Sequence, residues 1–148
     1  MYDYSAVRRW TAEHHKIDYC VLDCELVVVP IHQMNHWVLG VIDMQAKRVL
    51  YYDSLGGVDR TAMDNLLSWF VEEASDKRND LRPDAREWAA HAPRDIPQQL
   101  NGCDCGAFAV LYALHVLHRV PLRGAFSQHD MPLLRRRLVV ALAQQRLS

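Results

Sequence analysis

Residues 36–54 read HWVLGVIDMQAKRVLYYDS. Two apolar runs, 36–43 and 48–54, stand on either side of the more polar segment 44–47. Apolar runs of this length around a short break are typical of two strands joined by a tight loop. The stretch therefore predicts a β-hairpin whose loop is residues 44–47.

The segments on both sides of the hairpin predict a small sheet among helices. Residues 25–31 (ELVVVPI) are apolar without alternation, which is typical of a central strand covered on both faces, with Pro30 near its end. Apolar spacing and helix-start signals predict four helices, over residues 4–12, 59–75, 104–119 and 127–146. A short strand is expected near residues 86–91, within a polar region that is otherwise loop. This order of elements predicts one α+β domain over residues 1–148.

Finer expectations concern the surfaces of these helices. Trp10 is expected on the apolar side of the first helix. Residues 104–119 form the most apolar helix and are expected to be buried. Ser127 and Asp130 have the spacing of a capping box at the start of the last helix. Glu73 belongs to a charged segment that is expected to be an ordinary polar helix end.

The composition limits the kind of protein. The chain has 148 residues, of which 50% are hydrophobic and 24% charged, values that exclude a disordered, collagen-like or coiled-coil chain. The net charge of −1 gives no bulk attraction to nucleic acid or to an anionic membrane, so neither is expected as a partner. The apolar runs are too short to cross a bilayer, and the first residues lack the apolar core of a secretory signal. Four cysteines are too few for a disulfide scaffold and favour a reducing compartment.

The hairpin also relates a histidine to a carboxylate. Pairing of Asp43 with Arg48 across the loop sets a register in which Asp53 lies opposite Val38. His36 is then a diagonal neighbour of Asp53 on the same face, within reach of its side chain. A slip of one residue would move one of the two to the other face. The hairpin alone leaves open the alternative of a loop histidine and a structural Asp-Ser turn.

Residues 97–106, PQQLNGCDCG, lead from a polar loop into the apolar helix. Cys105 stands at the helix start, where the positive end of the helix dipole favours a thiolate. A cysteine hydrolase needs such a nucleophile, a histidine base and a group that orients the histidine, and His36 and Asp53 fit these two roles. Gln99 is placed to donate its amide to a developing oxyanion beside the Cys105 N–H. The alternative is that Cys105 is a small core residue at a helix start.

Four segments together resemble the Ulp/SENP family of SUMO-specific cysteine proteases. They are His36-Trp37, YYDSLGG at 51–57, PQQLNGCDCGAFA at 97–109 and FSQHDMPLLRRRLV at 126–139. The resemblance covers nearly the whole chain. It implies a papain-like cysteine protease fold, α+β, with a small central mixed sheet flanked by helices.

The resemblance, carried over residue by residue, implies a set of site residues. His36 would be the general base, Asp53 its orienting partner and Cys105 the nucleophile. Gln99 would donate to the oxyanion. Trp37 would cover a narrow tunnel that admits the Gly-Gly tail of the substrate, where any β-carbon would meet the aromatic wall.

The same resemblance implies the reaction and the partners. Family members cleave peptide bonds in SUMO precursors and isopeptide bonds to target lysines, without a cofactor or a metal. SUMO and SUMO-conjugated proteins are the expected partners of a monomer, in the nucleus or also in the cytoplasm. The alternatives are a SUMO-binding fragment with impaired catalysis, a NEDD8-directed protease of the same family, and an acyltransferase of related fold.

The chain departs from the family in three respects. Ala107 stands where the family usually has methionine. Cys103 stands where the family usually has serine, which places a second thiol two residues from Cys105. The family's catalytic domain extends upstream of Met1, so the chain is expected to lack the N-terminal portion of that domain.

Three further clusters have ordinary explanations. Four potential metal ligands fit no standard zinc spacing and are expected to be buried cysteines and exposed histidines: His14, His15, Cys20 and Cys24. His115 and His118 are expected to be helix histidines with ordinary hydrogen bonds. The basic run at 135–137 is expected to be a solvated helix face.

Overall fold

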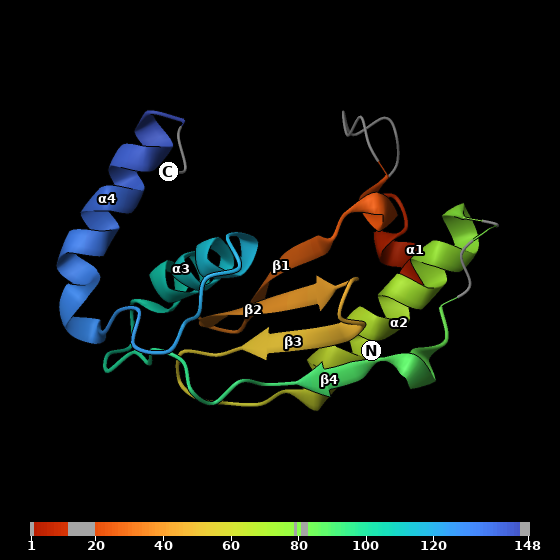
Figure 1. Cartoon of the computed structure of the whole chain (residues 1–148), viewed down its shortest axis with the longest axis horizontal. Coiled ribbons are helices and arrows are strands. Elements are labelled where there is room, and N and C mark those ends of the chain that lie inside the picture. The colour runs from red at the N-terminus through yellow and green to blue at the C-terminus, as the bar shows by residue number, and fades with distance from the viewer. Residues whose placement is uncertain (1, 12–19, 79, 81–82, 146–148) are drawn as a thin grey trace. The chain divides into compact units, whose positions relative to one another are not determined.

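The structure is a computed structural model that describes residues 2–11, 20–78, 80 and 83–145. Its strands form a single sheet in the order β1-β2-β3-β4, and Figure 1 shows β2 and β3 running in opposite directions. The strands are β1 (Leu26–Gln33), β2 (His36–Asp43), β3 (Arg48–Tyr52) and β4 (Ala89–His91). Because β3 and β4 pair in parallel, the sheet is mixed, as predicted.

The helices complete the α+β architecture predicted from the sequence. They are α1 (Tyr4–Val7), α2 (Arg60–Lys77), α3 (Cys105–Leu117) and α4 (Met131–Ala143), with short 3₁₀ helices η2 (Val21–Asp23), η3 (Ala85–Glu87) and η4 (Gln128–Asp130). Within the described ranges, the structure contains no helix with both the length and the apolar character needed to cross a bilayer.

The hairpin of β2 and β3 is confirmed. Asp43, at the end of β2, is only 1% exposed and accepts hydrogen bonds from the Arg48 guanidinium at 3.1 and 3.2 Å. The same carboxylate accepts the backbone N–H of Ala46 at 3.1 Å. Asp43 therefore joins the two ends of the hairpin loop, and its partner Arg48 is the residue expected opposite it.

The prediction of a central strand at 25–31 was wrong. β1 stands at the edge of the sheet in the part of the chain that the structure describes, and most of its residues are only partly buried. Pro30 lies in the interior of the strand and is exposed. Proline removes a donor from the ladder, and an edge strand tolerates this because one of its sides has no partner strand.

The first helix is shorter than the predicted 4–12. α1 ends at Val7 and the chain continues in a turn in which the Trp10 N–H bonds to the Val7 carbonyl at 2.9 Å. Trp10 is 68% exposed, so it does not supply the buried face expected of it. Helix formation has a costly nucleus and is stabilised mainly by packing of an apolar face, so a segment without such a face forms only a short helix.

The second helix is confirmed at 59–75 and continues to Lys77. Asp59 caps α2 by accepting the Ala62 N–H at 3.0 Å, and Met63, Phe70 and Ala74 are buried on one face. The strand expected near 86–91 is confirmed as β4, preceded by η3. Both elements contact α2, where the Trp88 ring lies 4.6 Å from the Phe70 ring, centroid to centroid.

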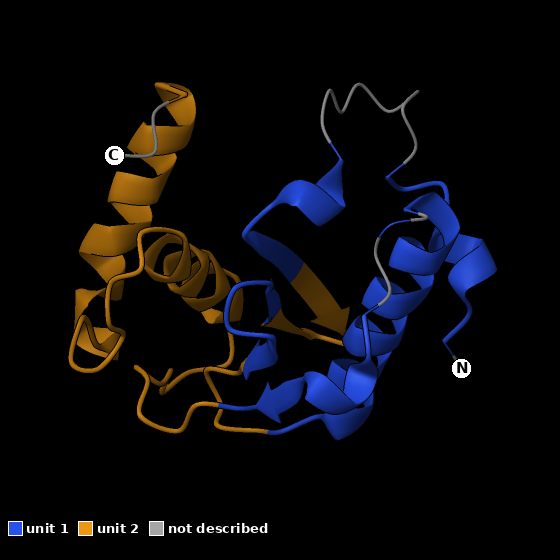
Figure 2. Ribbon diagram, turned by 45° about the vertical axis from the view of Figure 1, so that its right-hand side comes forward, with its two compact units in different colours: residues 1–29, 40–51, 58–92 blue, residues 30–39, 52–57, 93–148 orange. Residues whose placement is uncertain are grey.

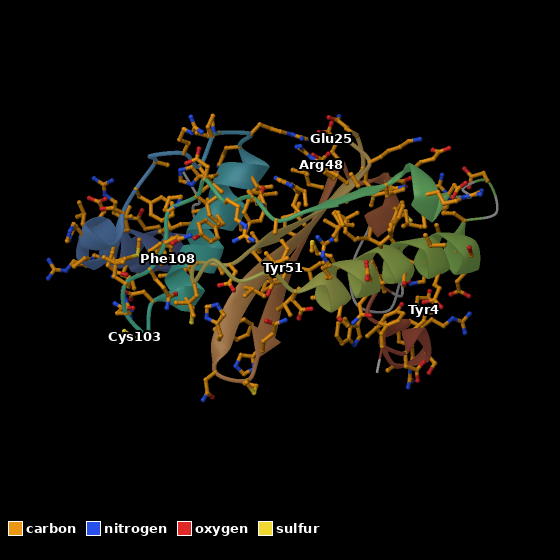
Figure 3. The ribbon with its side chains drawn as sticks, turned by 90° about the horizontal axis from the view of Figure 1, so that it is seen from below. Tyr4, Glu25, Arg48, Tyr51, Cys103 and Phe108 are labelled. Atoms are coloured by element: carbon orange, nitrogen blue, oxygen red, sulfur yellow. The ribbon has the colours of Figure 1, made fainter. Side chains whose placement is uncertain are left out.

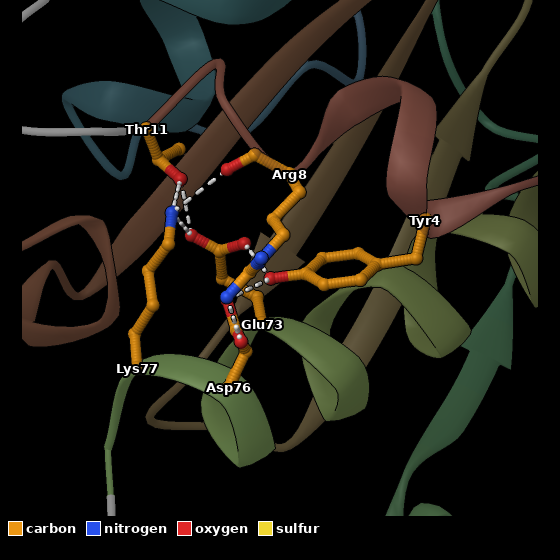
Figure 4. A network of polar contacts seen from close by, with 6 residues as sticks. All are labelled: Tyr4, Arg8, Thr11, Glu73, Asp76 and Lys77. Carbon is orange, nitrogen blue, oxygen red and sulfur yellow. Dashed lines mark hydrogen bonds and ion pairs between the residues drawn. The ribbon is translucent and has the colours of Figure 1, made fainter.

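The expectation of an ordinary polar end for α2 was wrong at one residue. Glu73 has no exposed surface, and its carboxylate accepts hydrogen bonds from Tyr4 Oη at 2.7 Å and Lys77 Nζ at 2.5 Å, and another from Thr11 (Figure 4). Arg8 pairs with the neighbouring Asp76. The end of α2 therefore holds the N-terminal segment through a buried carboxylate.

The last two helices differ in detail from the prediction. α3 buries one face, while Val110 and Leu117 on its other side are 45% and 51% exposed, so the helix is not fully buried. The capping box of Ser127 and Asp130 is present. It starts the 3₁₀ helix η4, and α4 itself begins at Met131.

The chain divides into two compact units, coloured separately in Figure 2. The first unit contains residues 1–29, 40–51 and 58–92, and the second contains residues 30–39, 52–57 and 93–148. The core of the second unit includes an aromatic cluster of Phe108, Tyr112 and Phe126. The five residues predicted for the site all belong to this second unit: His36, Trp37, Asp53, Gln99 and Cys105.

Candidate active site

His36 and Asp53 meet at the end of the hairpin, as the register argument predicted. His36 begins β2, and Asp53 directly follows β3. His36 Nε2 lies 2.7 Å from Asp53 Oδ1. Asp53 is 8% exposed, and its carboxylate also accepts the backbone N–H of Leu55 at 2.8 Å and of Gly57 at 3.1 Å. The carboxylate is thus held in place by its own turn, with one oxygen aimed at the imidazole.

The turn after Asp53 requires its two glycines. Gly56 has a φ of +75°, a left-handed conformation that glycine adopts without strain. A β-carbon on Gly57 would lie 2.4 Å from Asp53 Oδ2, closer than any real contact. The absence of a side chain at position 57 therefore allows the backbone to reach around the carboxylate.

Cys105 is the first residue of α3 and is 6% exposed. At this position the backbone N–H has no carbonyl partner within the helix, and the positive end of the helix dipole lies beside the thiol. A β-carbon on the next residue, Gly106, would lie 3.8 Å from Trp37 Cδ1. Since Trp37 follows His36 directly, the structure brings the cysteine and the histidine segments together.

Gln99 is buried and is held at both ends of its amide. Its Oε1 accepts the Ser54 hydroxyl at 2.6 Å, and its Nε2 donates to the Asn101 carbonyl at 2.5 Å. The Gln99 backbone N–H bonds to the Ser54 carbonyl at 2.9 Å, which ties the loop to the turn after Asp53. The side-chain NH₂ carries two hydrogens, so one donor remains for another acceptor.

Sequence reasoning missed Asp104, the residue before the nucleophile candidate. Its carboxylate is 5% exposed and accepts hydrogen bonds from Asn101 Nδ2 at 2.7 Å, from Gln128 Nε2 at 2.8 Å and from Arg135. These hydrogen bonds hold the pKa of the Asp104 carboxyl below its ordinary value. The basic run at 135–137 is exposed, as expected for a solvated face, and Arg135 in addition reaches Asp104.

Tyr112 anchors the start of the loop that carries Gln99. Its hydroxyl donates to the Pro97 carbonyl, and the residue is 1% exposed. Burial, together with the nearby Asp53 carboxylate, raises the pKa of this hydroxyl above its ordinary value. The group therefore stays protonated and remains a donor, which anchors the start of the segment that carries Gln99.

Trp37 is 41% exposed, and its ring packs against His32 with 4.6 Å between the ring centroids. The indole thus has His32 on one side and the start of α3 nearby. Cys103, by contrast, is exposed and lies at the outer end of the loop before α3 (Figure 3). The two cysteines of this loop therefore differ in environment, one buried at the helix start and one facing solvent.

The other candidate ligands and histidines are described only in part. His14 and His15 lie outside the described residues, and Cys20 and Cys24 are partly buried. In the described ranges no group of three or more His, Cys, Asp or Glu residues is arranged to hold a metal ion. His115 Nδ1 lies 2.8 Å from the Leu111 carbonyl, which is the ordinary helix hydrogen bond expected for it.

Comparison with known proteins gives a family match over almost the entire chain. The family model "Ulp1 protease family, C-terminal catalytic domain" matches residues 2–147. The chain is 40% identical over 147 residues to human Sentrin-specific protease 2 and 40% identical over 136 residues to the Ubiquitin-like-specific protease ESD4 of Arabidopsis thaliana. These alignments cover 97% and 92% of the chain but 23% and 27% of the two relatives, so the chain spans about a quarter of their length.

Solved structures agree with this assignment. The X-ray structure of the C-terminal Ulp1 protease domain in complex with Smt3, the yeast ortholog of SUMO, aligns with a TM-score of 0.68 at 27% identity, over 90% of this chain and 57% of that one. The Ulp1-like SUMO protease catalytic domain of Chaetomium thermophilum has the same fold, with a TM-score of 0.81 at 24% identity over 98% of this chain and 56% of that one. The chain belongs to the Ulp1 protease family.

Proposed function

We propose that this chain is a cysteine peptidase that cleaves after the C-terminal Gly-Gly of SUMO, both in precursors and in conjugates to target lysines. The observation that carries the proposal is the hydrogen bond between His36 Nε2 and Asp53 Oδ1 at 2.7 Å. This bond occupies Nε2 and leaves Nδ1 for the thiol of Cys105. An imidazole oriented in this way serves a cysteine nucleophile as general base.

The first half of the reaction forms a thioester. The Cys105 thiolate attacks the carbonyl carbon of the last glycine of SUMO, and the carbonyl oxygen becomes an oxyanion. The second hydrogen of the Gln99 amide and the backbone N–H of Cys105 donate to this oxygen. The imidazolium of His36, stabilised by Asp53, gives its proton to the leaving amine, which is the lysine side chain or the next residue of a precursor.

The second half releases SUMO. Neutral His36 accepts a proton from water, and the resulting hydroxide equivalent attacks the thioester carbon. The oxyanion uses the same two donors and then collapses with Cys105 as the leaving group. The Asp53 carboxylate accepts from the backbone N–H groups of Leu55 and Gly57 and faces His36, so it keeps the imidazole oriented through both halves.

The preference for a Gly-Gly tail follows from the position of Trp37. Its indole is partly exposed and lies 3.8 Å from where a β-carbon on Gly106 would stand, beside the nucleophile. A substrate residue that crosses the indole beside Cys105 would bring any β-carbon against the ring, so glycine is the residue that fits there. The Smt3 complex of the Ulp1 domain supports SUMO as the partner. We also propose a nuclear location, on family grounds alone.

The test uses SUMO with a C-terminal vinyl sulfone, beside ubiquitin and NEDD8 carrying the same group. We expect a covalent adduct with SUMO that Cys105→Ala abolishes, detected as a mass shift of the intact protein. If the chain binds unmodified SUMO but forms no adduct, it is a SUMO-binding fragment and not a peptidase. Faster reaction with the NEDD8 probe would redirect the proposal to NEDD8.

A further inference from the structure

The side chain of Gln128, outside the proposed catalytic set, connects two points of the loop before Cys105. Gln128 lies in η4, more than twenty residues further along the chain. Its Oε1 accepts the backbone N–H of Leu100 at 2.9 Å, and its Nε2 donates to Asp104 Oδ2 at 2.8 Å. A single planar amide therefore fixes the distance between these two points of the loop.

These two points stand next to the two proposed oxyanion donors. Leu100 directly follows Gln99, whose side-chain amide is one donor. Asp104 directly precedes Cys105, whose backbone N–H is the other. The two hydrogen-bond partners of Gln128 are thus each one residue away from a proposed donor.

Asp104 keeps other partners when Gln128 is removed. Its carboxylate also accepts from Asn101 and Arg135, so loss of the Gln128 amide would not leave a buried charge unpaired. A cavity of about 380 Å³, lined by Gln128, Asp104 and Arg135 among others, lies beside the contact. Water can enter this space and solvate the freed groups, so a truncated side chain at 128 is compatible with folding.

We propose that Gln128 is a positioning residue that sets the spacing of the two oxyanion donors. The inference rests on the proposed function, because it assigns Gln99 and the Cys105 N–H to the oxyanion. Donors that drift apart stabilise the tetrahedral intermediate less, while substrate binding and thiolate formation do not depend on their spacing. Gln128 therefore acts on the chemical step.

The first test compares Gln128→Ala and Gln128→Glu with wild type on SUMO carrying a C-terminal coumarin amide. Gln128→Ala removes both contacts, and Gln128→Glu keeps the acceptor for Leu100 but turns a like charge toward Asp104. We expect kcat to fall about tenfold in both variants, a fraction of the effect of losing a donor outright, with KM within about twofold. Gln144→Ala, on an exposed residue after α4, is the matched control and should leave kcat unchanged.

The second test separates positioning from general damage to the fold. Alkylation of Cys105 by iodoacetamide, followed by site-resolved mass spectrometry, needs the thiolate but no oxyanion donor, and its rate should stay within about twofold of wild type. The affinity for an acetyl-Gly-Gly aldehyde, which forms a thiohemiacetal whose oxygen uses the donors, should fall about tenfold. An alkylation rate that falls as much as kcat, or a kcat equal to wild type, overturns the inference.

The aldehyde also distinguishes this inference from the proposed function. If wild type does not process SUMO but binds the aldehyde, the proposed substrate is wrong, and Gln128→Ala still decides the inference through the aldehyde affinity. If wild type binds no aldehyde at Cys105, no oxyanion site exists and the inference fails as well.

Discussion

The Gly57 backbone packs against the Asp53 carboxylate because Gly57 has no side chain. A β-carbon at position 57 would lie 2.4 Å from Asp53 Oδ2. The Gly57 backbone N–H donates to that same oxygen at 3.1 Å. The other oxygen of the carboxylate faces His36 at 2.7 Å. A methyl group at position 57 therefore acts on the histidine through the carboxylate.

Gly57→Ala should lower kcat by about 100-fold, because a displacement of about 1 Å in the Asp53 carboxylate misaligns His36. The measurement is steady-state hydrolysis of the SUMO coumarin amide. A double-mutant cycle supplies the control: in an Asp53→Ala background the same glycine change should alter kcat by no more than about twofold. Equal effects in both backgrounds would mean that the methyl group acts elsewhere.

Cys103→Ser should retain SUMO adduct formation within about twofold of wild type. Cys103 is exposed, and its backbone N–H donates to Asn101 Oδ1 at 3.2 Å. Serine is close to cysteine in size and leaves that backbone contact intact. The rate of reaction with SUMO vinyl sulfone checks this, with Cys105→Ala as the opposite extreme. Loss of the adduct in Cys103→Ser would assign the exposed thiol a part in the chemistry.

Asp104→Asn should reduce the free energy of unfolding at pH 7 by about 2 kcal/mol, the scale of hydrogen bonds to a charged group. Folding lowers the pKa of this carboxyl below its ordinary 3.8, so the ionised form stabilises the folded state above that pH. The stabilisation is lost as the pH falls through the lower folded-state pKa. Urea unfolding at pH 7 and at pH 3 measures the difference between variant and wild type, which should shrink at the lower pH. A difference that is independent of pH would mean that ionisation of Asp104 contributes nothing.

Glu73→Gln should destabilise the protein by about 2 kcal/mol, because the buried carboxylate accepts from Tyr4, Thr11 and Lys77. The adjacent Glu72→Gln is the matched control, since Glu72 is exposed and bonds only to Tyr2 among the described residues. Its effect should stay within about 0.5 kcal/mol. Urea denaturation measures the free energy of unfolding of both variants. Similar losses would mean that burial of the Glu73 carboxylate adds no stability beyond that of an exposed one.

Local pattern was enough to predict much of this fold. The hairpin of β2 and β3 follows from two apolar runs around a four-residue loop, and α2 and α3 follow from helical spacing. The approach of His36 to Asp53 follows from hairpin register, because strand pairing across a short loop relates residues close in sequence. Cys105 at the start of α3 follows from the change between a polar loop and an apolar helix.

The sequence by itself determined the strands and helices whose signals are local, and it identified the residues proposed for the active site. Tertiary structure alone decided the edge position of β1, the burial of Glu73 and the clamp of Gln128 on Leu100 and Asp104. Each of these depends on partners far along the chain, such as Tyr4 for Glu73. Periodicity and motifs report which face of an element is apolar, but they do not report which distant polar group will meet it.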